Sequence, residues 1–205
     1  MAQPRRDHTA TLLSDDTVLV VGGHGEGGEV LAAAEVYEPS TRSWTSAGTM
    51  AQPRVRHTAT IMTDGRVLVV GGGRAPTEMY NPSVGTWLLA PSTEHALDFH
   101  TATLLADGSA LAAGGVADDI PVLASAEVYE PTDDYWMSTG SMVQARRGHT
   151  ATLLHDGRVL VASGTDEDGY LASAEVYHPA SGTWTPTSNM PEPRREKVEM
   201  YHIGG

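Results

Sequence analysis

The chain contains no cysteine among its 205 residues and has a single phenylalanine. The absence of cysteine excludes disulfide bonds, thiolate nucleophiles and cysteine-ligated metal sites, and it leaves the redox compartment undecided. Long apolar runs are also missing, since none approaches the roughly 18–20 residues that a membrane-spanning helix needs. No apolar stretch follows the first six residues, so we predict no signal peptide and, by default, a cytoplasmic protein.

Basic residues are scarce relative to acidic ones. Thirteen lysines and arginines stand against 26 aspartates and glutamates, which gives a formal net charge of −13. A field of this sign repels phosphate backbones and anionic lipid headgroups. We therefore predict that neither nucleic acid nor a membrane surface is a partner. The acidic excess favours solubility or a cationic partner.

What the chain does contain is a pattern that occurs four times. The string His-Thr-Ala-Thr begins at His8, His57, His100 and His149. Each copy continues through a turn, an apolar run that ends in glycine, a Glu-x-Tyr string and a tryptophan seven residues after the tyrosine. Repeated units of this length predict one domain built from similar modules. We place the four units at about 1–49, 50–92, 93–141 and 142–189.

Each unit is predicted to form four short antiparallel strands. Asp-Gly dipeptides at 64–65, 107–108 and 156–157 lie between two apolar runs, which is the strongest short-range signal for a β-hairpin. A proline two residues after each tyrosine ends the third strand, because proline cannot donate to a β-ladder. Strands that are apolar on both sides need cover on both faces, and radial stacking of four-stranded sheets provides it.

Glycine pair, tyrosine and tryptophan at a period near 50 together resemble the kelch repeat, and His-Thr-Ala-Thr-Leu-Leu resembles its bacterial branch. The resemblance covers residues 1–189. It implies an all-β fold, a kelch-type β-propeller of four four-stranded antiparallel blades with the first strand of each blade nearest the axis. Residues 190–205 begin a partial fifth repeat, in which we expect one extra strand over 198–203.

Kelch propellers usually have six or seven blades, which leaves two arrangements open for this chain. One is an unusually small closed ring, and the other is an open array whose blade edges pair with another chain. We favour a monomer over self-association through such edges.

Strand alternation brings the loops between second and third strands to the same end as the links between blades. These loops, at 24–32, 73–77, 116–124 and 164–172, differ in length, and variable loops on a repeated scaffold usually carry recognition. We therefore predict a binding module that recognises a protein segment or a glycan through this face, without cofactor or metal.

Arginines recur in the links and are candidate ligand-binding residues, because converging guanidinium groups suit a carboxylate or phosphate. They are Arg5, Arg54, Arg146 and Arg147. The alternative that we favour is pairing with a glutamate of the third strand: Glu35, Glu78, Glu127 or Glu175. The four histidines recur with the scaffold, so we interpret them as hydrogen-bond partners of the inner strands and not as a ring of metal ligands.

The third link lacks the methionine and the arginine four residues later that the other three links share. Glu94, His95 and Asp98 place two carboxylates and an imidazole within five residues, a set that suits a divalent cation or acid–base chemistry. These three are candidate catalytic residues, and His95 and Phe99 are also candidate ligand-binding residues. A drifted repeat with solvated charges is the interpretation that we favour.

The alternative function is a small propeller enzyme, an isomerase, mutarotase or lyase, that combines the third link with arginines of other blades. The resemblance supplies two enzyme precedents, the galactose oxidase type and the sialic acid mutarotase type. The first needs a tyrosine crosslinked to cysteine, which this chain lacks. The second needs a funnel in which arginines meet acid and base residues, which requires Glu94, His95 or Asp98 to approach an arginine of another blade.

Overall fold

The structure is a computed structural model that describes residues 1, 3–73 and 76–193, and its regular elements are β-strands. Blade 1 consists of β1 (Thr9–Leu12), β2 (Val18–Val21), β3 (Ala33–Glu38) and β4 (Ser43–Thr49). Blade 2 consists of β5 (Thr58–Ile61), β6 (Val67–Val70), β7 (Glu78–Asn81) and β8 (Thr86–Leu89). Blade 3 consists of β9 (Thr101–Leu104), β10 (Ala110–Ala113), β11 (Ala126–Glu130) and β12 (Tyr135–Ser138). Blade 4 consists of β13 (Thr150–Leu153), β14 (Val159–Ala162), β15 (Ala174–His178) and β16 (Thr183–Pro186).

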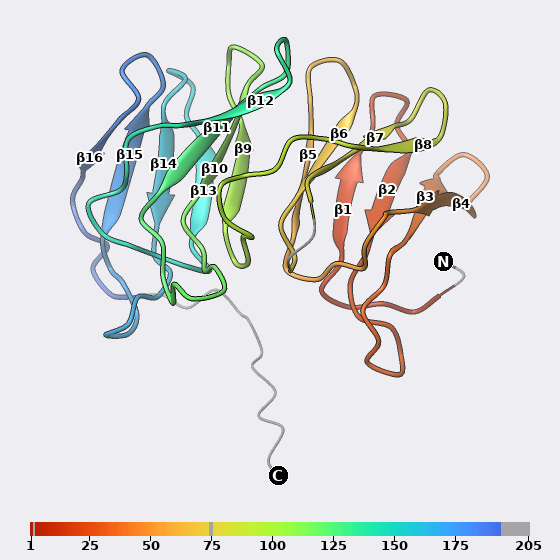
Figure 1. The fold of residues 1–205 in the computed structure, drawn as a ribbon, viewed down its shortest axis with the longest axis horizontal. Coiled ribbons are helices and arrows are strands. Elements are labelled where there is room, and N and C mark those ends of the chain that lie inside the picture. Colours follow the sequence, from red (N-terminus) through yellow and green to blue (C-terminus); the bar gives the residue numbers. More distant parts are fainter. Residues whose placement is uncertain (2, 74–75, 194–205) are drawn as a thin grey trace.

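The strands of each blade pair antiparallel in the order of the chain, so the predicted four-stranded blades are confirmed. The innermost strands pack side by side, β1 against β5, β5 against β9 and β9 against β13 (Figure 1). Within the described residues, no packing of similar extent joins β13 to β1. The blades therefore form an open fan, with blade 1 at the right and blade 4 at the left of Figure 1. The predicted strand at 198–203 lies outside the described residues, and the monomer stays a prediction.

The core lies between neighbouring blades. Leu19 of β2 packs with Val67 of β6 between blades 1 and 2. Because successive residues of a strand point to opposite faces, the next residue of β6, Leu68, packs against blade 3. Leu111 of β10 and Val159 of β14 meet in the same way between blades 3 and 4. The apolar runs of the second strands therefore face a neighbouring blade on each side.

The tyrosine and tryptophan of each repeat pair across the third and fourth strands. Their ring centroids are 4.9–5.3 Å apart and their planes are inclined at 40–46°. The indole N–H also reaches the preceding blade: Trp87 donates to the carbonyl oxygen of Ala47 at 2.8 Å, and Trp184 to that of Gly140 at 2.7 Å. The tryptophan thus recurs because it serves its own blade and the junction with the one before.

A glycine at the end of the second strand lets the next blade approach. Gly22 has a φ of +62°, and a Cβ there would lie 2.6 Å from the carbonyl oxygen of Arg54 and 2.8 Å from Cε1 of His57. The N–H of Gly23 donates to the same Arg54 carbonyl at 2.8 Å. The left-handed backbone and the close approach of the next link both require glycine at position 22.

Candidate binding face

The links between blades and the loops between second and third strands form one end of the molecule, the lower edge in Figure 1. We call this end the loop face; it comprises the links 3–8, 50–57, 92–100 and 142–149 and the loops 22–32, 71–73, 76–77, 114–125 and 163–173. Backbone bridges join links to loops within a blade, as between Arg6 and His24 or between Arg147 and Thr165. The two kinds of segment therefore form one ordered surface.

Three of the link arginines are buried inside their blades. The side chains of Arg5, Arg54 and Arg146 have no exposed surface, and each guanidinium lies 2.8–3.0 Å from a glutamate: Glu35, Glu78 and Glu175. The favoured pairing with blade glutamates is therefore confirmed for these three arginines. A ligand would have to displace a buried carboxylate to reach them, so their burial speaks against their role as ligand-binding residues.

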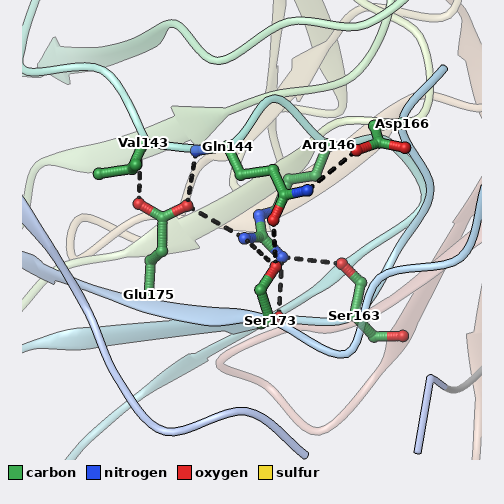
Figure 2. Close-up of polar contacts among 7 residues, drawn as sticks. All are labelled: Val143, Gln144, Arg146, Ser163, Asp166, Ser173 and Glu175. Atoms are coloured by element: carbon green, nitrogen blue, oxygen red, sulfur yellow. Dashed lines mark hydrogen bonds and ion pairs between the residues drawn. The ribbon is translucent and has the colours of Figure 1, made fainter. Parts of the chain in front are cut away.

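Figure 2 shows how the pair in blade 4 joins a link to its blade. The guanidinium of Arg146 donates to the carbonyl oxygens of Ser163 at 2.9 Å and Ser173 at 3.1 Å, and to the Glu175 carboxylate at 3.0 Å. The same carboxylate accepts the backbone N–H of Val143 at 2.7 Å. One ion pair thus holds the link and both ends of the loop.

The repeated histidines connect the innermost strands to one another. The ring Nε2 lies 2.9–3.0 Å from a threonine hydroxyl of the preceding blade in three copies: His57 with Thr9, His100 with Thr58 and His149 with Thr101. Burial, the largest cause, lowers the pKa of His57 to about 4 and those of His100 and His149 to about 3. Neutral rings that bridge two strands confirm the hydrogen-bonding interpretation.

Comparison with known proteins identifies the repeat. A family model described as the Kelch motif matches residues 5–51 and 146–191, the first and fourth copies. These two copies are similar to the Kelch motif. A solved structure titled "Structure of YjhT" is similar with a TM-score of 0.78 and 15% identity, over 94% of this chain and 73% of that chain. That likeness is one of fold, four-stranded antiparallel blades arranged as in a β-propeller. No curated protein matches the chain.

The three candidate catalytic residues of the third repeat do not converge. The N–H of Glu94 donates to both carboxylate oxygens of Glu127 at 3.1 Å, whereas the Asp98 carboxylate accepts the N–H of Gly73 at 2.8 Å. His95 lines an open depression of about 360 Å³ together with Thr93, Leu97 and Asp118. Among the described residues, none of the three candidates forms a hydrogen bond or ion pair with an arginine of another blade, which is the approach that the enzyme alternative requires.

Phe99 lies immediately before a scaffold histidine, in a left-handed backbone conformation. Its φ is +55°, which is uncommon for a bulky residue, and the same position is left-handed in the other links: Asp7 at +55°, Arg56 at +61° and Gly148 at +56°. The conformation therefore belongs to the repeated scaffold. The guanidinium of Arg56 stacks on the Phe99 ring at 4.5 Å from its centroid, so one face of the ring is occupied.

Arg147 is the one candidate arginine of the links that lies at the surface of its blade. It is partly exposed and donates to the Thr165 hydroxyl at 3.3 Å and to the Pro121 carbonyl at 3.4 Å. Among the residues that the structure describes, no carboxylate forms an ion pair with it. Arg147, His95 and Phe99 remain predicted ligand-binding residues.

Among the described residues, four exposed apolar side chains of the loop face were not singled out from the sequence: Val143 of the fourth link, which is 71% exposed, and three in the loops. Val30, Ile120 and Tyr170 expose 38%, 36% and 51% of their surface. Each closes the hairpin of its loop by a backbone bridge, to His24, Ala117 and Thr165. The available signal is an apolar residue that follows the acidic tip of three loops of unequal length.

Neither a membrane-spanning helix nor a cluster of metal-binding side chains is found in the part of the chain that the structure describes. Across residues 1, 3–73 and 76–193, no helix is long and apolar enough to cross a membrane. Within the same ranges, no three histidine, aspartate or glutamate side chains gather as they would around a metal ion.

Proposed function

We propose that the chain is a non-catalytic binding module that recognises a protein segment through its loop face. Kelch repeats are commonly protein-interaction modules. The observation that carries the proposal is the exposure of Val30, Ile120 and Tyr170, which come from three different blades and lie on the same end of the molecule. Exposed apolar and aromatic side chains at one end of a scaffold offer contact surface to a partner, and aromatic residues are enriched in interfaces.

The charge of the loops indicates which segment fits. Each of the three long loops carries a pair of exposed acidic residues at its tip: Glu26 and Glu29, Asp118 and Asp119, Glu167 and Asp168. Opposite charge on a partner speeds association and selects against wrong partners. The loop face therefore suits a segment in which basic residues alternate with apolar ones.

Four residues of the loop face that the sequence singled out are held by the scaffold, which supports binding over catalysis. Buried glutamates hold the arginines at 5, 54 and 146, and a backbone N–H holds the Asp98 carboxylate. Acid–base catalysis needs these groups free and within reach of one substrate. A glycan is the second ligand class that we predicted from the sequence.

Selection of binding peptides from a random display library, followed by affinity titration, tests the proposal. Ile120→Ser and Tyr170→Ser each remove exposed apolar surface from the loop face and should weaken binding by about tenfold. Val84→Ser is the matched control, because Val84 is 66% exposed but lies in the turn between β7 and β8 at the opposite end. Unchanged affinity in both loop variants, or an equal loss in the control, would show that another surface binds.

A further inference from the structure

Blade 3 keeps the glutamate of the buried ion pair but lacks the arginine. Glu127 of β11 stands opposite Ala112, in the register that Glu78 and Glu175 occupy in blades 2 and 4. The arginine position, three residues before the repeated histidine, is held by Leu97. Blades 1, 2 and 4 thus contain the complete ion pair, whereas blade 3 contains the glutamate without the arginine.

The carboxylate of Glu127 is enclosed and has no counter-ion. The residue is 9% exposed, it accepts the N–H of Glu94, and it forms no ion pair with any residue that the structure describes. Burial raises the pKa of its carboxyl group, and the nearby Glu94 charge adds to the rise, whereas the Glu94 N–H and the His95 charge oppose it. The Glu94 N–H and His95 therefore offset the desolvation of this carboxylate only in part, as expected for a buried pair that has lost one partner.

The other blades show which group satisfies this site. In blade 4 the guanidinium of Arg146 touches a carboxylate and the carbonyl oxygens at the two ends of the loop, those of Ser163 and Ser173. The corresponding carbonyls of blade 3 belong to Gly114 and Ser125, which keep the same backbone bond, at 3.0 Å. Leucine has no donor for any of these acceptors.

We propose that Glu127, with the carbonyl oxygens of Gly114 and Ser125, binds a guanidinium group, supplied as an arginine side chain of the recognised segment. A planar fork of N–H donors matches one carboxylate and two carbonyls better than a point-like ammonium group does. An open depression is lined by Thr93, His95 and Leu97 of the same link, and Glu94, whose N–H holds the carboxylate, stands between the first two of these residues in the chain. The site itself stands on the geometry, and its occupant rests on the proposed function.

A titration with methylguanidinium tests the site without any partner. The readout is the NMR chemical shift of the Glu94 backbone amide. We expect a saturable shift that the neutral isostere methylurea does not cause. Glu127→Gln keeps the shape of the side chain and should weaken the apparent affinity by about tenfold or more. Leu97→Arg places a guanidinium on the same link and should abolish the response.

A shift that does not saturate, or that methylurea or Glu127→Gln reproduces, overturns the inference. The selected peptides separate this failure from failure of the proposed function. If the peptides need Ile120 but bind equally well after their arginine is replaced by citrulline, binding at the loop face is supported and the guanidinium site is refuted. A saturable methylguanidinium response without any peptide binding would support the guanidinium site and refute the proposed function.

Discussion

Replacing Arg146 by leucine would give blade 4 the arrangement that blade 3 has naturally. The substitution removes hydrogen bonds to Ser163, Ser173 and Glu175 and leaves the Glu175 carboxylate buried without its cation. Breaking a buried pair by removing one partner costs about 3–5 kcal/mol of the free energy of unfolding. For a chain of this length the melting temperature should fall by about 10 °C.

The double variant Arg146→Leu/Glu175→Leu separates the two parts of this cost. Apolar residues in place of both charges leave no uncompensated carboxylate, so most of the lost stability should return. Urea unfolding followed by tryptophan fluorescence measures both variants, because Trp184 lies in the same blade. If the single variant loses less than about 1 kcal/mol, or if the double variant is no better than the single one, the pair does not hold the link as we argue.

Two further predictions concern the junctions between blades. Gly22→Ala should lower the free energy of unfolding by about 3 kcal/mol, because the new Cβ would collide with the next link; Gly85→Ala has a similar φ, +67°, but open space, and should cost about 1 kcal/mol. Equal losses in urea unfolding would contradict the steric argument. The free energy of unfolding should also fall between pH 7 and pH 5, because the unfolded imidazoles, with an ordinary pKa of 6.5, bind protons that His57, His100 and His149 do not bind in the folded state. The slope should be up to about 1.4 kcal/mol per pH unit for each histidine, and His100→Asn should reduce it.

The blades could be predicted from the sequence because each repeated residue makes a contact that recurs in the fold. Tyr37 and Trp44 recur because they stack across two strands, and Gly22 recurs because the next link approaches it. A sequence period near 50 residues therefore predicts that such contacts recur from blade to blade. The role of the link arginines could not be predicted in this way. Their repetition is consistent both with a ligand-binding clamp and with a buried ion pair, and only the tertiary packing distinguishes these two roles.

Non-repeated contacts were decided by the tertiary structure alone. Asp98 looked like a candidate acid or base, yet its carboxylate holds the N–H of Gly73, a residue of the neighbouring blade that no local pattern connects to it. Val30, Ile120 and Tyr170 are ordinary apolar residues in sequence, and their exposure depends on how each loop folds back on itself. The sequence by itself determined the four blades and the end that carries the variable loops, because both follow from local alternation and repetition. Which side chains remain free to meet a partner depended on contacts between blades, and these are set by packing in three dimensions.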